Sequence, residues 1–404
     1  MSPRRSLESG GIAGAVMTPG DELEPRIAVE LVPLPPTAAL EGEWRDLEDR
    51  SDGSFFVGWS WIGCWITALD RAVDLRLLRA RLDGRTVGLC VLARYRERRH
   101  GLITSRTLRL HTTGRAEFDS LLIECNGPLV ARGLGAAVER TMFAHLFESD
   151  GTWDELVLDG LWSLPDWLAN SPAQVRVTAS VAHCVALGEV RARNGDYLGL
   201  LGAKTRSRIR RSLTEYERIG PCVVQAATDV AQAQAFLVGL KALHQSSWVA
   251  RGQPGAFASP FFEDFHRRLV STAFGRGEIQ LLAVDAGARR IGYIYNFLYR
   301  GRIYNYQSGF DYEVCEKHNR PGLVAHARAI EFNARAGHAI YDFLAGDLEY
   351  KQALGTGAGS ISWVVVQRER LRFRVEDAAR ALRRWLRRSP KPAAPQQPAA
   401  GAPD

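Results

Sequence analysis

The chain has 404 residues, of which 46% are hydrophobic and 24% charged, and this composition is typical of a globular protein. Its length exceeds what one hydrophobic core usually holds, so we expect two domains. The formal net charge is +7, which favours anionic partners such as phosphates, coenzyme A, nucleic acid or acidic lipid without choosing among them.

The sequence lacks the usual signals of membrane insertion, export and metal binding. It has no apolar run of roughly eighteen residues or more, so we expect no transmembrane span. The stretch 10–16 is too short and too rich in glycine for a signal peptide, which makes the cytoplasm the expected location. The six cysteines form no C-x-x-C pair and the nine histidines form no metal-binding pattern. We therefore expect buried free thiols and no metal.

The two ends of the chain differ in composition from the first folded segments. Residues 1–25 are rich in Gly, Pro and Ser, and residues 389–404 are almost wholly Pro, Ala, Gln and Gly, so both are expected to be disordered. A helical segment is expected at 40–47. An aromatic cluster follows, in which Trp61 and Trp65 lie four residues apart and share a helix face.

Three helices are predicted in the middle of the chain, at 197–218, 230–248 and 260–274. The first has an apolar stripe formed by Ile209, Leu213 and Tyr216. Its other face is cationic and consists of Lys204, Arg206, Arg208, Arg210 and Arg211. Such a face is usually solvated charge, and phosphates are the ligands it would favour if it binds anything.

An antiparallel meander is predicted next, with strands at 279–284, 290–299 and 303–306 separated by turn residues. A polar loop at 316–322 then opens a helix whose apolar residues recur at helical spacing, and Gly337 ends it. After one more strand comes the polar string Asp-Phe-Leu-Ala-Gly-Asp-Leu-Glu-Tyr-Lys. This order of elements suits an acyl-transfer site.

The chain also shows signs of an internal duplication. Residues 77–98 align without a gap to residues 281–302, with Leu, Arg, Gly and Tyr identities at matching positions. Further on, at a shorter offset, Asp154 recurs as Asp342. Both matches fall in the same order and on the same predicted elements, which indicates two related halves.

The last helix, expected at 368–388, places Leu371, Val375, Ala379, Leu382 and Leu386 on one side and arginines on the other. This pattern is typical of a helix that lies on a membrane surface. We nevertheless expect the helix to dock against the second domain.

Four groups of residues carry a family resemblance. They are Lys204-Thr-Arg-x-x-Ile-Arg-Arg with Glu217 and Gly220, Leu243-His244 with Trp248 and Arg251-Gly252, Arg320-Pro-Gly-Leu323, and Asp342-Phe-Leu-Ala-Gly with Tyr350-Lys351. Together they resemble the acetyltransferase domain of CelD-like cellulose and exopolysaccharide biosynthesis proteins. This domain is part of the GNAT acyl-CoA acyltransferase superfamily and is close to the FemAB peptidyltransferases. The resemblance covers roughly residues 40–365.

The resemblance implies an α/β (α+β) architecture of two GNAT-like folds in tandem, each a mixed, mainly antiparallel sheet flanked by helices. We expect the first GNAT-like domain at 26–190 and the second, the acetyltransferase domain, at 191–367. The basic helix at 368–388 would follow, between the second domain and the terminal tail.

A helix N-terminus offers unpaired amides and a partial positive charge, so the residues Arg320, Pro321, Gly322 and Leu323 could hold a pyrophosphate. The resemblance implies that coenzyme A lies here. The usual superfamily pattern, Arg or Gln, two residues, Gly, one residue, Gly or Ala, is absent at this position but occurs at 132–137. Either half could therefore bind the cofactor, and a plain helix cap is the alternative at both.

Acylation of an amine needs a base for the nucleophile and a donor for the charge that develops on the thioester carbonyl. Asp347 is the first candidate for the base and Tyr350 for the acid, with Asp342 and Lys351 beside them. Because Asp154 recurs opposite Asp342, a bracing role for Asp342 is equally open. His244, Trp248 and Arg251 suit a sugar or carboxylate acceptor, although a helical His or Trp is more often a core residue.

Taken together, these residues and the resemblance predict an N-acyltransferase that uses acetyl-CoA or another acyl-CoA and no metal. The acceptor would be an amine on an amino sugar, an amino acid or an envelope-polysaccharide precursor. One rival is a FemAB-like transferase that takes an aminoacyl group from tRNA, and another is a non-catalytic partner in polysaccharide synthesis. DNA is not an expected partner, and peripheral membrane contact stays open.

Overall fold

The computed structural model describes residues 27–99, 103–315 and 317–388. The first half contains β1 Ala28–Pro33, α1 Thr37–Asp49, α2 Trp59–Ala68, β2 Asp74–Leu82, β3 Arg85–Arg99, β4 Ile103–Leu110, β5 Leu129–Val130, α3 Gly135–Ser149, β6 Glu155–Leu161 and β7 Gln174–Ala186. The second half contains α4 Leu187–Ala192, α5 Ala203–Ile219, β8 Cys222–Ala226, α6 Val230–Val249, α7 Pro260–Ala273, β9 Ile279–Ala286, β10 Arg289–Tyr299, β11 Arg302–Phe310, α8 Pro321–Arg335, β12 Ile340–Ala345, α9 Glu349–Leu354, β13 Gly357–Gln367 and, at the end, α10 Leu371–Arg388. The predicted tails at 1–25 and 389–404 lie outside the described residues.

The strands form one 13-stranded sheet in the order β1-β2-β3-β4-β6-β13-β7-β12-β11-β10-β9-β8, with β5 beside β3. Each half repeats one plan. Four antiparallel strands lead to a single parallel pairing, β4 with β6 in the first half and β11 with β12 in the second. A helix connects the paired strands in both cases, α3 in one and α8 in the other. The predicted tandem arrangement of mixed, mainly antiparallel sheet with flanking helices is confirmed.

The duplicated hairpins also share one register. Leu77 pairs with Val91 on β2 and β3, and the residues aligned with them, Leu281 and Tyr295, pair on β9 and β10. A register shift by one residue would turn every side chain to the other face of the sheet, so an equal register preserves the same inward-facing set in both halves.

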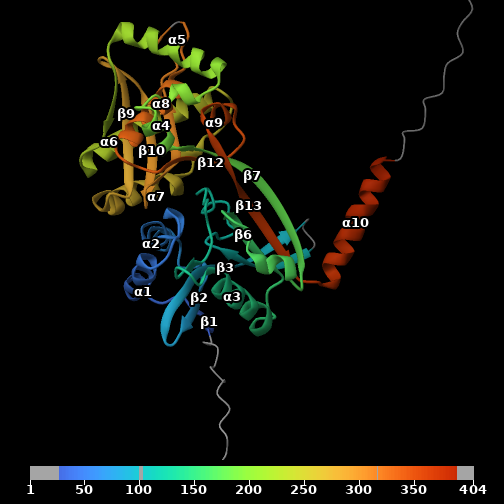
Figure 1. The fold of residues 1–404 in the computed structure, drawn as a ribbon. Helices are drawn as coiled ribbons and strands as arrows, with labels where there is room; N and C mark the ends of the chain where they lie inside the picture. The colour runs from blue at the N-terminus through green and yellow to red at the C-terminus, as the bar shows by residue number, and fades with distance from the viewer. Residues whose placement is uncertain (1–26, 100–102, 316, 389–404) are drawn as a thin grey trace, which may run out of the picture.

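The two halves exchange their last strands. β7, which ends the first half, pairs antiparallel with β12 of the second half. β13, which ends the second half, pairs with β6 of the first. β13 also pairs along its whole length with residues 174–184 of β7, and Figure 1 shows the two as long strands that run from one lobe to the other. Each half therefore completes the other's sheet, while the limits of the two domains stay a prediction.

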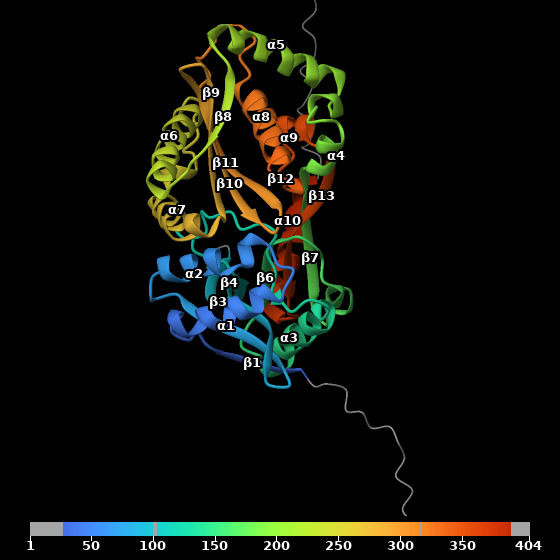
Figure 2. The same ribbon diagram turned by 60° about the vertical axis from the view of Figure 1, so that its left-hand side comes forward.

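Helices cover both faces of the second-half sheet, as Figure 2 shows. Side chains alternate along β9 between two cores. Leu281 and Ala283 join the core that includes α6 and α7, whereas Leu282 and Val284 join the core that includes α5 and α8. The helices α6 and α7 therefore lie on the opposite face of the sheet from α8.

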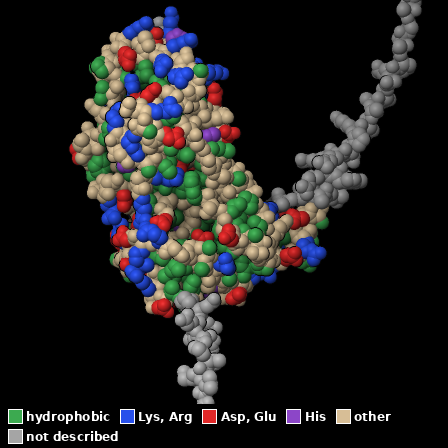
Figure 3. Space-filling view, in the orientation of Figure 1, with side chains coloured by type: hydrophobic (Ala, Val, Ile, Leu, Met, Phe, Trp, Pro, Cys, Tyr) green, Lys and Arg blue, Asp and Glu red, His purple; other side chains and the backbone are tan. Residues whose placement is uncertain are grey.

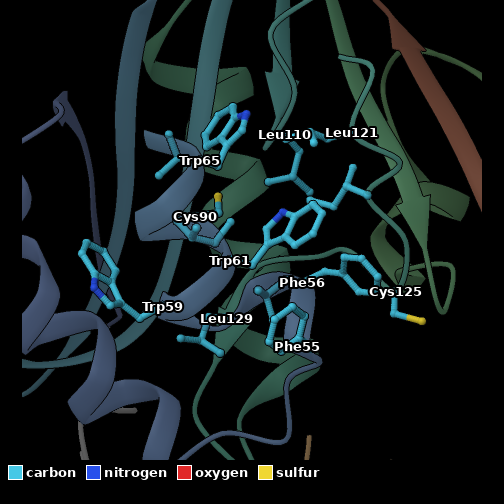
Figure 4. Packing of buried hydrophobic residues seen from close by; sticks show 14 of the residues in the cluster. Phe55, Phe56, Trp59, Trp61, Trp65, Cys90, Leu110, Leu121, Cys125 and Leu129 are labelled. Carbon is cyan, nitrogen blue, oxygen red and sulfur yellow. The ribbon is translucent and has the colours of Figure 1, made fainter. Parts of the chain in front are cut away.

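An aromatic cluster joins the halves. Phe55 stacks on Phe297 of β10 with ring centroids 4.3 Å apart, and Trp61 of α2 meets Phe265 of α7 edge to face at 4.9 Å. Figure 4 shows Trp61 close to Phe55 and Phe56 within the buried cluster. Trp61 and Trp65 are 1% and 2% exposed, so the predicted shared face is a core face. Burial of this much aromatic surface makes the interface between the halves a part of the core.

The helix α5 begins later than predicted, at Ala203, because residues 198–200 form a separate short 3-10 turn before Gly202. Its predicted core residues Ile209, Leu213 and Tyr216 are buried. Its cationic residues are exposed or half-buried. Figure 3 shows Lys and Arg side chains at the top of the molecule, where Figure 1 places α5.

The described part of α10 contacts the first half of the chain. Arg372 pairs with Asp154, and the guanidinium of Arg99 lies 5.4 Å from the ring of Phe373. The expectation that this helix docks on the second domain is therefore wrong for the described side chains. Over residues 27–99, 103–315 and 317–388, no helix combines the length and apolar character needed to cross a membrane.

Candidate active site

The strands β11 and β12 diverge after a short parallel pairing. Residues 302–304 pair with residues 340–342, and the ladder between the two strands stops at Tyr304 and Asp342. Past that point, β11 continues to Phe310 along β10, with an irregularity in register opposite Tyr295 and Asn296. We call this divergence the β11–β12 fork, formed by residues 305–310 and 343–345. Ligands of open α/β sheets bind at the carboxyl ends of parallel strands, which is where the fork opens.

The first half has no comparable fork in the described residues. β4 and β6 stay paired up to Leu110, which is the last residue of β4, and its partner Leu158. The space beyond is taken by Asn126, which forms a bridge to Leu161 and donates its side-chain amide to the carbonyls of Leu110 and Asp159. Arg132 begins the superfamily pattern at 132–137, and its guanidinium donates to Asp52 at 2.8 Å. The two halves therefore differ where a cofactor would enter.

The N-terminus of α8 follows β11 and lies at the carboxyl end of the fork. Arg320 is exposed, Pro321 occupies the first turn and Gly322 and Leu323 are half-buried. A proline at this position costs no hydrogen bond, because first-turn amides have no partner within the helix. A side chain at Gly322 would lie 3.2 Å from the ring of Phe310, so glycine fits the close approach of this turn to β11.

The helix α5 holds the loop that leads into α8. The Ser212 hydroxyl donates to the carbonyl of His318, and the Tyr216 hydroxyl donates to the side-chain oxygen of Asn319. Arg208 of α5 also lies 3.3 Å from Glu349 of α9. The cationic helix therefore borders both the α8 N-terminus and the segment that carries the predicted catalytic residues.

The string that begins at Asp342 forms a strained turn at the end of β12. Asp342 is 0% exposed, and it accepts from Arg302 at 2.7 Å and from the Leu344 amide at 2.8 Å. Burial raises its pKa, although the guanidinium and the amide oppose this. Leu344 has a φ of 60°, and such a conformation costs a residue other than glycine about 1 kcal/mol or more. Both carboxylate oxygens of Asp342 are thus engaged in holding the turn.

Asp154, the first-half counterpart of Asp342, has a similar environment. It is also 0% exposed, and it accepts from the backbone amide of Arg106 at 2.8 Å and from its guanidinium at 3.3 Å. Because each aspartate ties a parallel strand to its neighbour through an arginine, the geometry favours the bracing role for Asp342.

Two further buried charges hold the same turn. Lys351 of α9 is 8% exposed and donates to the carbonyls of Leu344 at 3.3 Å and Ala345 at 2.5 Å. Glu124 is also 8% exposed and accepts from the Ala345 amide at 2.5 Å. Burial lowers the pKa of Lys351, and the neighbouring carboxylates of Glu124 and Asp342 oppose that change.

Among the buried charged groups of this cluster, Glu124 has the pKa best suited to a catalytic base. Burial raises its pKa to about 7, with the amide of Ala345 and the charge of Lys351 opposing. A catalytic base works best when its pKa is close to the working pH. Glu124 was not among the predicted site residues, because it comes from the segment before β5, in the other half of the chain. The one available signal was a carboxylate directly after the apolar run Leu121-Leu-Ile123.

Of the predicted acid and base, Tyr350 is half-buried beside the cluster and Asp347 is at its rim. The Tyr350 ring stacks on His326 of α8 with centroids 5.5 Å apart, and burial raises the pKa of its phenol. The Asp347 side chain is 72% exposed, and its Oδ1 lies 3.5 Å from Nε2 of His183. The structure therefore brings Tyr350, Lys351 and Asp342 together with Glu124, and leaves Asp347 at the solvent edge.

His326 lies fully buried beside the fork. Burial lowers the pKa of its imidazole to about 3, so the ring is neutral at physiological pH. Its Nδ1 lies 3.4 Å from the Tyr341 hydroxyl, and its Nε2 is buried without a hydrogen-bond partner among the described residues. A buried polar atom without a partner is rare in folded proteins and is a reason to expect a bound group or water nearby.

The predicted acceptor residues lie together, but on the other face of the sheet from α8. His244 is 5% exposed; its Nδ1 donates to the carbonyl of Ser308 at 3.2 Å and its Nε2 accepts from the Ala256 amide at 3.3 Å. The ring of Trp248 lies 5.6 Å from the His244 ring, and the guanidinium of Arg251 lies 5.8 Å from the Trp248 ring. Both ring nitrogens of His244 are thus occupied by backbone groups, which favours the structural role for this histidine.

An open groove of about 680 Å³ lies between α6 and α7. Its lining includes Gln234, Glu263, Arg267 and Ser271 and none of the predicted site residues. Size alone does not identify a reactive site, whereas buried charges at a strained turn are typical of one. We therefore regard the fork as the candidate active site. The described residues contain no group of three or more His, Cys, Asp and Glu side chains that could hold a metal ion.

Residues 203–352 match the family model described as an acetyltransferase (GNAT) domain. No curated protein matches the chain in sequence. Among solved structures, the chain is similar to a conserved protein of unknown function from Bacteroides thetaiotaomicron VPI-5482, at 11% identity and a TM-score of 0.52, over 84% of this chain and 100% of that chain. It is also similar to FemX, at 10% identity and a TM-score of 0.51, over 82% of this chain and 96% of FemX. The chain thus has the GNAT/FemAB-like fold, and residues 203–352 are the part of it that resembles the acetyltransferase (GNAT) domain.

Proposed function

We propose that this protein is an acyl-CoA-dependent N-acyltransferase. It transfers an acetyl group to an amine on an amino sugar, an amino acid or an envelope-polysaccharide precursor. The observation that carries the proposal is the β11–β12 fork, with the α8 N-terminus at its open end and a buried carboxylate of near-neutral pKa, Glu124, beside the strained turn.

The residues around the fork fit an acyl-CoA. Arg320 and the first-turn amides at Gly322 and Leu323 would bind the pyrophosphate, because a helix N-terminus presents donors and a partial positive charge to an anion. The pantetheine arm carries amides that would pair with backbone groups in the fork. The unpartnered Nε2 of His326 offers a further polar contact. The corresponding space of the first half is closed by Asn126, so we assign the cofactor to the second half.

Glu124 would take the proton from the attacking amine. The amine nitrogen then bonds to the thioester carbon, the carbon–sulfur bond breaks, and the thiolate of coenzyme A leaves. We assign Tyr350 as the acid that protonates this thiolate, since burial raises the pKa of its phenol and the group is protonated at neutral pH. Asp342 and Lys351 position the turn. Asp347, at the rim, is the alternative base.

Direct transfer between the two substrates is proposed, without an acyl-enzyme. Burial raises the pKa of all six cysteine thiols, Cys64, Cys90, Cys125, Cys184, Cys222 and Cys315. The thiolate is the nucleophilic form, so none of these cysteines is activated to accept the acyl group.

A FemAB-like transfer from aminoacyl-tRNA is the second candidate. The cationic α5 beside the α8 N-terminus supports it, because an extended row of exposed cations suits a polyanion. Titration with acetyl-CoA and with aminoacyl-tRNA at rising salt separates the two, since tRNA binding should weaken steeply. If coenzyme A fails to raise the melting temperature and no acyl transfer occurs, a non-catalytic partner in polysaccharide synthesis is favoured.

The roles of Asp347 and Tyr350 are tested by Asp347→Asn and Tyr350→Phe, with acetyl-CoA binding measured beside turnover. We expect Tyr350→Phe to lower kcat by about tenfold or more while binding is kept. Asp347→Asn should change kcat little if Glu124 is the base. Equal turnover in wild type and Tyr350→Phe would remove Tyr350 as the acid, and a large loss in Asp347→Asn would make Asp347 the base.

A further inference from the structure

The helix α10 is attached to the body of the protein by part of its polar face. Phe373 and Glu376, three residues apart on one side of the helix, are 3% and 5% exposed. Both contact Arg99 of β3, Phe373 through its ring and Glu376 through an ion pair of 3.4 Å. Arg372 pairs with the buried Asp154. The first two turns of α10 are therefore held in a defined orientation on the first half.

This orientation turns the apolar stripe of α10 away from the body. Leu371 is 77% exposed, Val375 is 60% exposed and Ala379 is also exposed. In the sequence, Leu382 and Leu386 continue the same helical spacing. A surface helix normally packs its apolar stripe on the core, and here Leu371, Val375 and Ala379 face solvent instead. Figure 1 shows α10 standing apart from the two lobes, joined to them at its N-terminal end.

The charges of α10 indicate what covers the stripe. Apart from Glu376 and Asp377, its charged residues are all arginines, at positions 372, 374, 380, 383, 384, 387 and 388. A second copy of the chain would bring an equally cationic helix into the contact. An anionic lipid surface would instead neutralise the arginines and accept the apolar side chains at the boundary between headgroups and acyl chains.

We propose that α10 binds the surface of anionic membranes through the stripe of Leu371, Val375 and Ala379, with its arginines other than Arg372, which pairs with Asp154, at the level of the lipid phosphates. This surface is separate from the fork and does not depend on acyl transfer. It would hold the fork near acceptors that are anchored in a membrane.

The test is co-sedimentation of the full-length protein with lipid vesicles. Wild type should bind vesicles that contain about one third phosphatidylglycerol, bind pure phosphatidylcholine vesicles weakly, and detach at high salt. The double variant Leu371→Glu with Val375→Glu should lower the partition coefficient by about tenfold or more. Both side chains are exposed, so an unchanged melting temperature is expected and checks the fold.

The matched control is Val238→Glu with Val249→Glu on α6, where the two valines are 63% and 64% exposed. It introduces the same two charges elsewhere and should leave vesicle binding nearly unchanged. Equal binding by wild type and the α10 variant would overturn the proposal, and so would an equal loss in both double variants. Wild type that fails to bind anionic vesicles, or that forms a dimer abolished by the α10 variant, would also overturn it.

Discussion

Replacement of Glu124 by glutamine is the most informative change at the candidate site. Glutamine keeps the size of the side chain and an oxygen that can accept from the Ala345 amide, but it cannot take a proton from an amine. General-base catalysis contributes about a hundredfold to ten-thousandfold in rate, so kcat should fall within that range. Because the carboxylate is the active form, kcat/KM of wild type should rise with pH through about 7, and this rise should be absent in the variant.

The same substitution should make the protein more stable at high pH. Burial raises the pKa of Glu124 from 4.5 to about 7, which corresponds to about 3 kcal/mol at about 1.4 kcal/mol per pKa unit. The folded chain holds this proton more tightly than the unfolded chain does. Wild type therefore loses that stability as pH rises from about 4.5 to about 7, and a glutamine at this position loses none. We expect Glu124→Gln to gain up to about 3 kcal/mol over wild type between pH 4.5 and pH 8.

Two measurements check the reasoning: release of the coenzyme A thiol in the presence of amines, and chemical unfolding across the same pH range. Glu139 of α3 provides the matched control, because burial raises its pKa to about 7 as well. This residue lies in the first half, on a helix that contributes no residue to the fork. Glu139→Gln should show the gain in stability and keep full turnover. The assignment of Glu124 is refuted if Glu124→Gln keeps its turnover within a few-fold or retains the rise near pH 7.

Two further predictions concern the turn after β12. Lys351→Met removes the donor to the carbonyls of Leu344 and Ala345 and the cation beside Glu124 and Asp342, so it should lower the free energy of unfolding by about 3 kcal/mol. The pH at which turnover rises should also move upward, and an unmoved pH profile would show that Lys351 does not act on Glu124. Asp342→Asn and Asp154→Asn each weaken a buried pairing with an arginine and should each cost about 2 kcal/mol in unfolding experiments. Only Asp342→Asn should also reduce acyl transfer, because only Asp342 holds the Leu344 amide; an equal loss of turnover in both would contradict this placement.

The sequence predicted the local elements of the second half closely. The strands β9 and β10 and the helix α8 agree with their predicted ranges within a few residues, because turn residues and apolar spacing are local signals. The strand β11 was predicted to end at Tyr306 but extends to Phe310. Its last residues, Gln307-Ser-Gly309, have little strand propensity of their own and are held in the strand by pairing with β10.

The duplication could also be predicted from the sequence, since the hairpin of β2 and β3 and the hairpin of β9 and β10 carry the same residue types at aligned positions. The exchange of β7 and β13 between the halves was not, because a strand's own sequence does not state which distant edge it will pair with. The spacing of apolar residues in α10 likewise predicted which side of the helix is apolar. It did not tell that Phe373 and Glu376, on the polar side, would be the face that contacts the body.

The sequence by itself therefore determined the tandem plan, the helix α8 of the second half and the polar string at 342–351. Only the tertiary structure showed which of those polar residues face one another and that Glu124 joins them across 221 residues of chain. The physical reason is that helix and strand formation follow the spacing of neighbouring side chains. The pKa of a carboxylate depends instead on burial and on charges brought close by the whole fold.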